Sequence, residues 1–132
     1  MSNRAIACVG LLIFSNVFMN LAWYGHLKWF KDHKLGFSLA ALALPIAISW
    51  LLALPEYMLQ VPANRLGHTN YGGPFAAPQL KIIQEAVTLV VFTGITIFIL
   101  KEKLRWTDGV AMMLILAAVC VSVWGRLASL TT

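Results

Sequence analysis

Apolar residues fill four long segments of the chain, and short segments rich in charged residues, glycine or proline separate them. A helix crosses a bilayer with about 20 mostly apolar residues, and each segment reaches that length. We therefore expect an all-α membrane protein with four transmembrane helices in a single domain, residues 1–132. The expected helices cover residues 4–27, 35–60, 78–100 and 107–127.

The composition supports this class, because 60% of the residues are hydrophobic and only 11% are charged. A soluble domain carries about 25% charged residues, so most of this protein's surface must face lipid. The net charge of +5 does not indicate nucleic-acid binding, since the basic residues stand at the ends of apolar segments. Basic side chains in that position anchor helices at headgroups, and the expected partner is the lipid bilayer.

Basic residues are distributed unevenly between the two ends of the expected helices. The turns after the first and third helices carry six Lys or Arg residues and the opposite end carries three, with Lys81 counted inside the third helix. Short loops rich in basic residues stay in the cytoplasm. The predicted orientation places both turns in the cytoplasm and both termini outside, in what we expect to be a bacterial inner (plasma) membrane.

One carboxylate, Glu85, lies inside the third apolar segment. An acid within a membrane helix costs roughly 2.5 kcal/mol or more to insert, so it usually faces protein or a watery cavity. Lys81, Gln84 and Thr88 recur with it at spacings of three and four, which brings them to one helix face. We expect this face to point into the bundle.

Polar residues follow the same spacing in the first two helices. Asn16, Asn20 and Trp23 form a stripe on the first, and Glu56 and Gln60 lie near the expected end of the second, on the same side of the membrane as the third helix's acid. Lipid offers such groups no hydrogen bonds, so both stripes are predicted to face inward. The candidate residues for binding a substrate or a proton are Glu85, Glu56, Lys81, Gln84, Gln60, Asn16, Asn20, Trp23 and Thr88.

Both acids also admit a structural interpretation. Lys81 lies one turn before Glu85, and an ion pair between these side chains would serve the fold without binding a ligand. Glu56, expected close to the headgroups, is open to the same interpretation. The spacing alone leaves both alternatives open.

Glycine and proline interrupt the chain between the second and third helices, over residues 62–77. Gly72, Gly73 and Pro74 disfavour any continued helix. We expect an ordered loop at the membrane interface, with Tyr71 at headgroup depth. The alternative is a gating lid.

The fourth helix has no acid in its apolar part but carries several small residues, which allow close approach of another helix. We expect it to form the main association surface of a homodimer or of a larger membrane complex. The residues concerned are Gly109, Ala117, Ala118, Ser122 and Gly125.

The chain contains neither a nucleophile–base arrangement nor a phosphate-binding loop, so we do not expect an enzyme. Cys8 and Cys120 each stand alone in an apolar segment, where thiols behave as small hydrophobes. The His and Cys residues lack the spacing of a metal site. No metal and no cofactor are expected.

Three runs of sequence resemble one family of small four-helix membrane proteins. They are residues 15–28, the run EYMLQVPANR at 56–65, and residues 79–85. That family is catalogued as a domain of unknown function within the drug/metabolite transporter superfamily, and the likeness covers nearly the whole chain. The resemblance implies a bundle like that of small multidrug-resistance exporters, in which two four-helix chains build one substrate pathway.

One departure from those exporters concerns their essential acid, which lies in the first helix. Here the first helix has Asn16 and Asn20 and no acid. If this chain exchanges protons for a cation as the exporters do, Glu85 or Glu56 must supply the carboxylate.

Two alternative functions are consistent with these residues and with the resemblance. The first is a transporter subunit that moves a small metabolite or an organic cation, with proton exchange at a buried carboxylate. The alternative is a non-transporting accessory subunit that packs against a larger membrane complex. A solvent-reachable Glu85 favours the first. A dry Lys81–Glu85 pair, together with an apolar contact along the fourth helix, favours the second.

Overall fold

A computed structural model describes residues 3–31 and 37–131 of the chain. Its four long helices are each apolar and long enough to cross a membrane, which confirms the expected fold class. They are accompanied by a short 3-10 helix, η1, and by a π-helical turn, η2. The elements are α1 (Asn3–Trp29), α2 (Leu39–Gly67), η1 (Thr69–Tyr71), α3 (Ala77–Ile95), η2 (Thr96–Leu100) and α4 (Trp106–Thr131).

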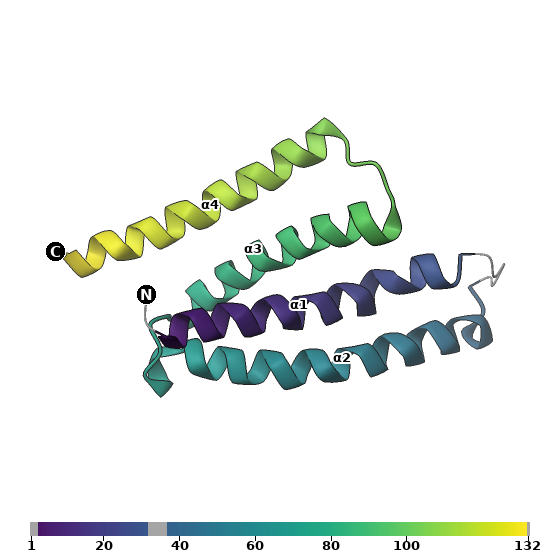
Figure 1. The fold of residues 1–132 in the computed structure, drawn as a ribbon, viewed down its shortest axis with the longest axis horizontal. Helices are drawn as coiled ribbons and strands as arrows, with labels where there is room; N and C mark the ends of the chain where they lie inside the picture. The colour runs from purple at the N-terminus through teal and green to yellow at the C-terminus, as the bar shows by residue number, and fades with distance from the viewer. Residues whose placement is uncertain (1–2, 32–36, 132) are drawn as a thin grey trace.

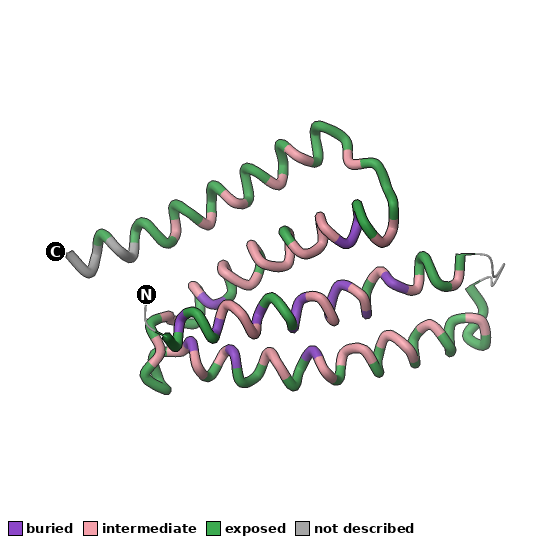
Figure 2. Tube along the Cα trace, in the orientation of Figure 1, coloured by how far each residue is buried: buried purple, intermediate pink, exposed green. Residues whose placement is uncertain are grey.

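Helix α1 lies between α2 and α3 and packs against both, whereas α4 packs against α3 and leans away from the other helices (Figure 1). Successive helices run in opposite directions, so both ends of the chain lie at the same end of the bundle (Figure 1). We call this end, where α2 stops and α3 starts, the terminal end. Figure 2 shows the buried positions concentrated along α1.

Small and polar side chains allow α1 to occupy the centre. Its buried positions recur every three or four residues, as expected for one helical face, and include Ala5, Cys8, Leu12 and Ser15. The apolar core joins Cys8 and Leu12 to Ala63 of α2 and to Leu80 of α3. This core lies near the terminal end, and the polar residues of α1 follow it towards the middle of the bundle.

Helix α2 extends past its predicted end at residue 60. Pro62 removes one backbone donor without ending the helix, which continues to Gly67 and stops where His68 takes an extended conformation. At the other end, Ser38 caps the helix by accepting a hydrogen bond from the backbone amide of Ala41 at 3.2 Å. The predicted start at residue 35 lies outside the described residues.

The connection between α2 and α3 is therefore shorter than predicted, and it is ordered. Phe75 donates its amide to the Gly67 carbonyl at 2.9 Å, and Thr69 donates to the Phe75 carbonyl at 2.9 Å. Gly72 turns the chain with a φ of 79°, a conformation that glycine adopts without strain. Arg4 of α1 donates a hydrogen bond to the Tyr71 carbonyl, which ties this connection to the start of the first helix.

Helix α3 ends in the π-helical turn η2, after which Lys101 adopts a left-handed conformation with a φ of 55°. The next helix starts at Trp106, close to the predicted residue 107. Its first turn is capped by Asp108, whose Oδ2 accepts from the backbone amide of Arg105 at 3.0 Å. This reversal directs α4 back along α3.

Candidate functional site

A polar contact joins α1 to α2 in the bundle interior. The hydroxyl of Ser15, which is fully buried, lies 3.0 Å from Gln60 Oε1 and 3.2 Å from the Glu56 carbonyl, so its proton is shared between two acceptors. The sequence analysis did not single out Ser15, although it lies one position before Asn16 on the inner face of α1. Gln60 is half-buried in this contact, in line with its predicted inward position.

Glu56 is the buried acid among the described residues, with 7% of its surface exposed. Its expected position near the end of α2 is wrong, because the helix continues for eleven more residues to Gly67. At about 1.5 Å per residue, Glu56 lies about 16 Å before that end. Among the described residues, no side chain donates a hydrogen bond to its carboxylate.

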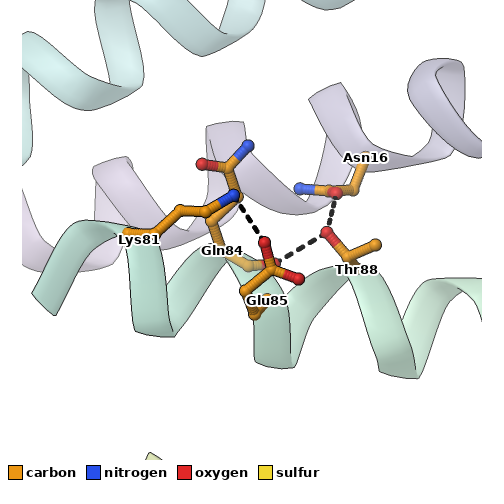
Figure 3. Close-up of polar contacts among 5 residues, drawn as sticks. All are labelled: Asn16, Lys81, Gln84, Glu85 and Thr88. Atoms are coloured by element: carbon orange, nitrogen blue, oxygen red, sulfur yellow. Dashed lines mark hydrogen bonds and ion pairs between the residues drawn. The ribbon is translucent and has the colours of Figure 1, made fainter. Parts of the chain in front are cut away.

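A second polar contact joins α1 to α3 (Figure 3). Thr88 Oγ1 lies 2.5 Å from Asn16 Oδ1 and 2.8 Å from the Gln84 carbonyl. The Asn16 amide donates to the Leu12 carbonyl at 2.7 Å. Asn16 is fully buried, so this contact fixes the rotation of α3 against α1 at a point where no water is available. Asn16 and Thr88 belong to two stripes that the sequence analysis expected to face inward, and the structure brings these two residues into contact.

Glu85 does not lie in the buried interior, and that expectation is corrected. Its side chain is 54% exposed and pairs with Lys81, whose side chain is 67% exposed, at a distance of 2.5 Å (Figure 3). The reason is the helical step of 100° between neighbouring residues. Gln84 and Thr88 face α1, and Lys81 and Glu85 therefore lie on the flank of α3.

That flank borders a pocket of about 190 Å³ between α1, α3 and α4, which we call the Glu85 pocket. It combines one carboxylate with an amide and three aromatic rings. Its lining residues are Asn20, Trp23, Tyr24, Glu85, Thr88, Leu89, Phe92 and Ile115.

Asn20 gives this pocket an unpaired acceptor. Its Nδ2 donates to the Asn16 carbonyl at 2.9 Å, and the residue is fully buried. Its Oδ1 has no hydrogen-bond donor among the described residues. An unpaired buried acceptor costs about 1–3 kcal/mol, and a donor brought within reach of this oxygen would remove that cost.

The aromatic side of the pocket comes from α1 and α3. The Tyr24 ring packs against the Phe92 ring with centroids 4.8 Å apart, and Trp23 meets Tyr24 edge-on at 6.4 Å. Trp23 was predicted to face inward, and that expectation is wrong, because 58% of its surface is exposed although it lines the pocket. Tyr24 and Phe92 were not predicted as site residues. Both were within reach of the helical pattern, since Tyr24 is one turn after Asn20 and Phe92 one turn after Thr88.

A second pocket, of about 490 Å³, opens at the terminal end between α2, the connection and α3. We call it the Arg65 pocket. It includes two predicted site residues, Lys81 and Gln84, and among the described residues no carboxylate lines it. A third hollow, between the far ends of α1 and α2, contains none of the predicted site residues.

The predicted association residues lie on a helix with little cover. None of the described residues of α4 is buried, and a Cβ added at Gly109 or Gly125 would meet no atom within 4 Å. Ala117 and Ala118 are exposed and Ser122 is half-buried. The described residues contain no cluster of three His, Cys, Asp or Glu side chains that could hold a metal ion.

Comparison with known proteins assigns the chain to a family. Residues 8–123 match the family model DMT_6, described as "Putative member of DMT superfamily (DUF486)". The chain belongs to this family. Membership in this drug/metabolite transporter family supports a transporter-like role in an integral membrane protein, rather than an enzymatic one. No curated protein and no solved structure matches the chain.

Proposed function

We propose that this DUF486 family member is one subunit of a transporter that binds a small organic cation at the Glu85 pocket. One observation carries the proposal. Glu85 and Asn20 line the same small pocket as three aromatic residues, and Asn20 Oδ1 is buried without a donor among the described residues. Family membership supports transport as such, and the lining of this pocket supports the type of solute.

The lining favours a cation that carries N–H groups. A carboxylate attracts positive charge, and the faces of Trp23, Tyr24 and Phe92 stabilise a cation by about 0.5–2 kcal/mol for each well-placed ring. Asn20 Oδ1 adds an acceptor that only a donor can satisfy. A protonated primary amine meets all three requirements, whereas a quaternary ammonium ion leaves the amide oxygen unpaired. The volume of about 190 Å³ accommodates an ammonium group with a short chain.

Exchange of the cation for a proton follows from the same carboxylate. Lys81, a proton and the substrate would compete for the negative charge of the Glu85 carboxylate. Its exposure makes it reachable from water in the isolated chain, because more than half of the side-chain surface is accessible. Competition between proton and substrate at one acid would couple uptake of one to release of the other. Glu56, with no described donor on its carboxylate, is a second candidate for carrying the proton.

A partner subunit would complete the pocket. Helix α4 contributes Ile115 to the Glu85 pocket, is otherwise little covered, and presents small residues to its surroundings. We infer a homodimer associated through Gly109, Ala117, Ala118, Ser122 and Gly125. The subunits would lie in a bacterial plasma membrane with both termini outside, as the distribution of basic residues favours.

An accessory subunit of a larger complex is the second candidate. The Lys81–Glu85 ion pair and the uncovered, apolar α4 favour it. A purely structural pair would be expected in a dry environment, however, and both of these side chains are more than half exposed. That exposure favours the transporter.

Equilibrium dialysis of the purified protein against labelled ethylammonium tests the proposal. We expect saturable binding that Glu85→Gln abolishes and that Glu102→Gln, in the connection between η2 and α4, leaves intact. Tetramethylammonium should bind at least several-fold more weakly than ethylammonium. Equal loss of binding in both Gln variants, or no saturable binding by the wild type, would overturn the proposed cation site.

A further inference from the structure

The Arg65 pocket has a polar lining that the proposed cation site does not use. The polar residues come from the end of α2, from the connection that follows it and from the first turns of α3. They are Asn64, Arg65, His68, Asn70, Lys81 and Gln84. Two of them are cations and, among the described residues, none is an acid. We propose that this pocket binds a phosphate group.

Arg65 is the principal ligand in this proposal. Among the described residues it forms no ion pair, and its guanidinium lies 5.3 Å from the centroid of the Tyr71 ring. Stacking on an aromatic face orients the planar guanidinium while leaving its N–H groups free along the edge. Such a fork binds two phosphate oxygens at once, which a lysine ammonium does not.

His68 adds a donor whose direction is set by the backbone. Its Nδ1 accepts a hydrogen bond from the Asn70 amide at 3.1 Å. In a neutral ring this places the proton on Nε2, which then donates. The side-chain amides of Asn64, Asn70 and Gln84 supply further N–H groups around the pocket. The lining therefore suits a ligand composed of several acceptor oxygens.

Lys81 supplies the second charge, although it already pairs with Glu85 at 2.5 Å. An ammonium group has three donors, and one carboxylate oxygen occupies one of them. The other two remain for a phosphate oxygen on the pocket side. The pocket thus offers one free cation in Arg65 and one shared cation in Lys81.

The position of the pocket also points to phosphate. It lies at the terminal end, beside the Tyr71 ring and the connection that Arg4 ties down. Tyrosine and arginine at a helix end are typical of headgroup depth, where the phosphates of lipids are found. The same chemistry would bind a free phosphate group from solution, and the two sources are distinguishable.

The test uses full-length protein purified in a phosphate-free maltoside detergent. Native mass spectrometry with added phosphatidylglycerol and equilibrium dialysis against inorganic phosphate measure the two sources separately. We expect one of these ligands to bind one per chain and to bind at least about tenfold more weakly to Arg65→Gln, since the variant loses the charged hydrogen bonds of the guanidinium. Arg105→Gln, at the opposite end of the molecule, is the matched control and should bind as the wild type does.

Binding of phosphatidylglycerol alone identifies a lipid headgroup site, and binding of inorganic phosphate identifies a solute site. Arg65→Lys checks folding and geometry together, because it keeps the charge but not the fork, and its affinity should fall between those of wild type and Arg65→Gln. The proposal is overturned if neither ligand binds the wild type. It is equally overturned if Arg65→Gln and Arg105→Gln weaken binding by the same factor.

Discussion

Lys81 Nζ lies 2.5 Å from Glu85 Oε1, and the two residues line different pockets. Lys81 borders the Arg65 pocket and Glu85 borders the Glu85 pocket. A ligand that attracts Lys81 therefore weakens the ion pair and leaves Glu85 freer to bind a cation, and a ligand that attracts Glu85 leaves Lys81 freer to bind an anion. If both pockets bind as proposed, this ion pair links the affinity for an anion to the affinity for a cation, and the linkage must be reciprocal.

Removing the lysine charge tests that linkage. In Lys81→Gln, the Glu85 carboxylate loses its competing cation, so the affinity for ethylammonium should rise between about 1.5-fold and 5-fold, as expected for an exposed ion pair. The affinity for the phosphate ligand should fall in the same variant. Equilibrium dialysis measures both, with Lys103→Gln as the control. Unchanged affinity for both ligands would show that the pair is structural.

If the Glu85 pocket binds a cation as proposed, Asn20 should distinguish amines from quaternary ammonium ions. Replacing it with leucine removes the unpaired Oδ1 and keeps a side chain of similar size. We expect ethylammonium to bind about tenfold more weakly, because one hydrogen bond to a charged donor is lost. Tetramethylammonium, which has no N–H group, should keep its affinity. A parallel loss for both ions would assign the effect to altered packing instead.

The same substitution should not destabilise the protein. The wild-type Asn20 leaves a buried oxygen without a donor among the described residues, so an apolar side chain there removes a cost of about 1–3 kcal/mol. Thermal unfolding in detergent should show an equal or higher midpoint for Asn20→Leu than for wild type. A clear drop would mean that the amide is satisfied in the folded protein.

Thr88 should matter more for stability than a comparable threonine elsewhere on α3. In Thr88→Val the fully buried Asn16 loses the donor on its Oδ1, which costs about 1–3 kcal/mol of unfolding free energy. Thr93→Val is the control, because Thr93 donates to its own helix and to the sulfur of Met112, a weak acceptor. Similar unfolding midpoints for the two variants would contradict the importance of the α1–α3 contact.

Gly67 marks the closest approach of α2 to the core. A Cβ there would lie 2.6 Å from Cys8 Sγ and 2.7 Å from Leu80 Cδ2, so Gly67→Ala should cost about 1–3 kcal/mol through overpacking. Gly94→Ala, at a helical position with no atom within 4 Å of the added carbon, should leave the unfolding midpoint unchanged or raise it. A lower unfolding midpoint for Gly94→Ala than for Gly67→Ala would contradict the position of the core beside Gly67.

Enlarging small side chains on α4 tests the proposed association surface. Ala118→Trp and Ser122→Trp should shift the protein from dimer towards monomer, because bulky side chains prevent the close helix approach that small residues permit. Ala47→Trp, on an exposed position of α2, is the control. Light scattering in detergent gives the mass. If both α4 variants keep the wild-type mass, the association surface lies elsewhere.

The sequence predicted the four helices because their apolar length leaves little choice. It predicted that Asn16 and Thr88 face inward because lipid offers polar groups no hydrogen bonds, but it did not pair the two residues. It misplaced the end of α2, since a proline removes only one backbone bond and packing of Ala63 and Gly67 against α1 holds the helix beyond it. Helical spacing grouped Glu85 with Thr88 but did not fix which side of α3 faces α1. Because neighbouring residues differ by about 100° around the helix axis, Gln84 faces α1 whereas Glu85 does not. Only the packed structure shows which acid is buried.

The account is tested most directly by proton release. Purified wild-type protein and its Glu85→Gln variant are mixed with ethylammonium chloride in weakly buffered detergent solution, and a pH-sensitive dye reports protons released. If cation and proton compete for the Glu85 carboxylate, the wild type should release protons in proportion to bound cation, and Glu85→Gln should release none. Equal proton release by both proteins, or cation binding by the wild type without proton release at any pH, would contradict proton exchange at Glu85.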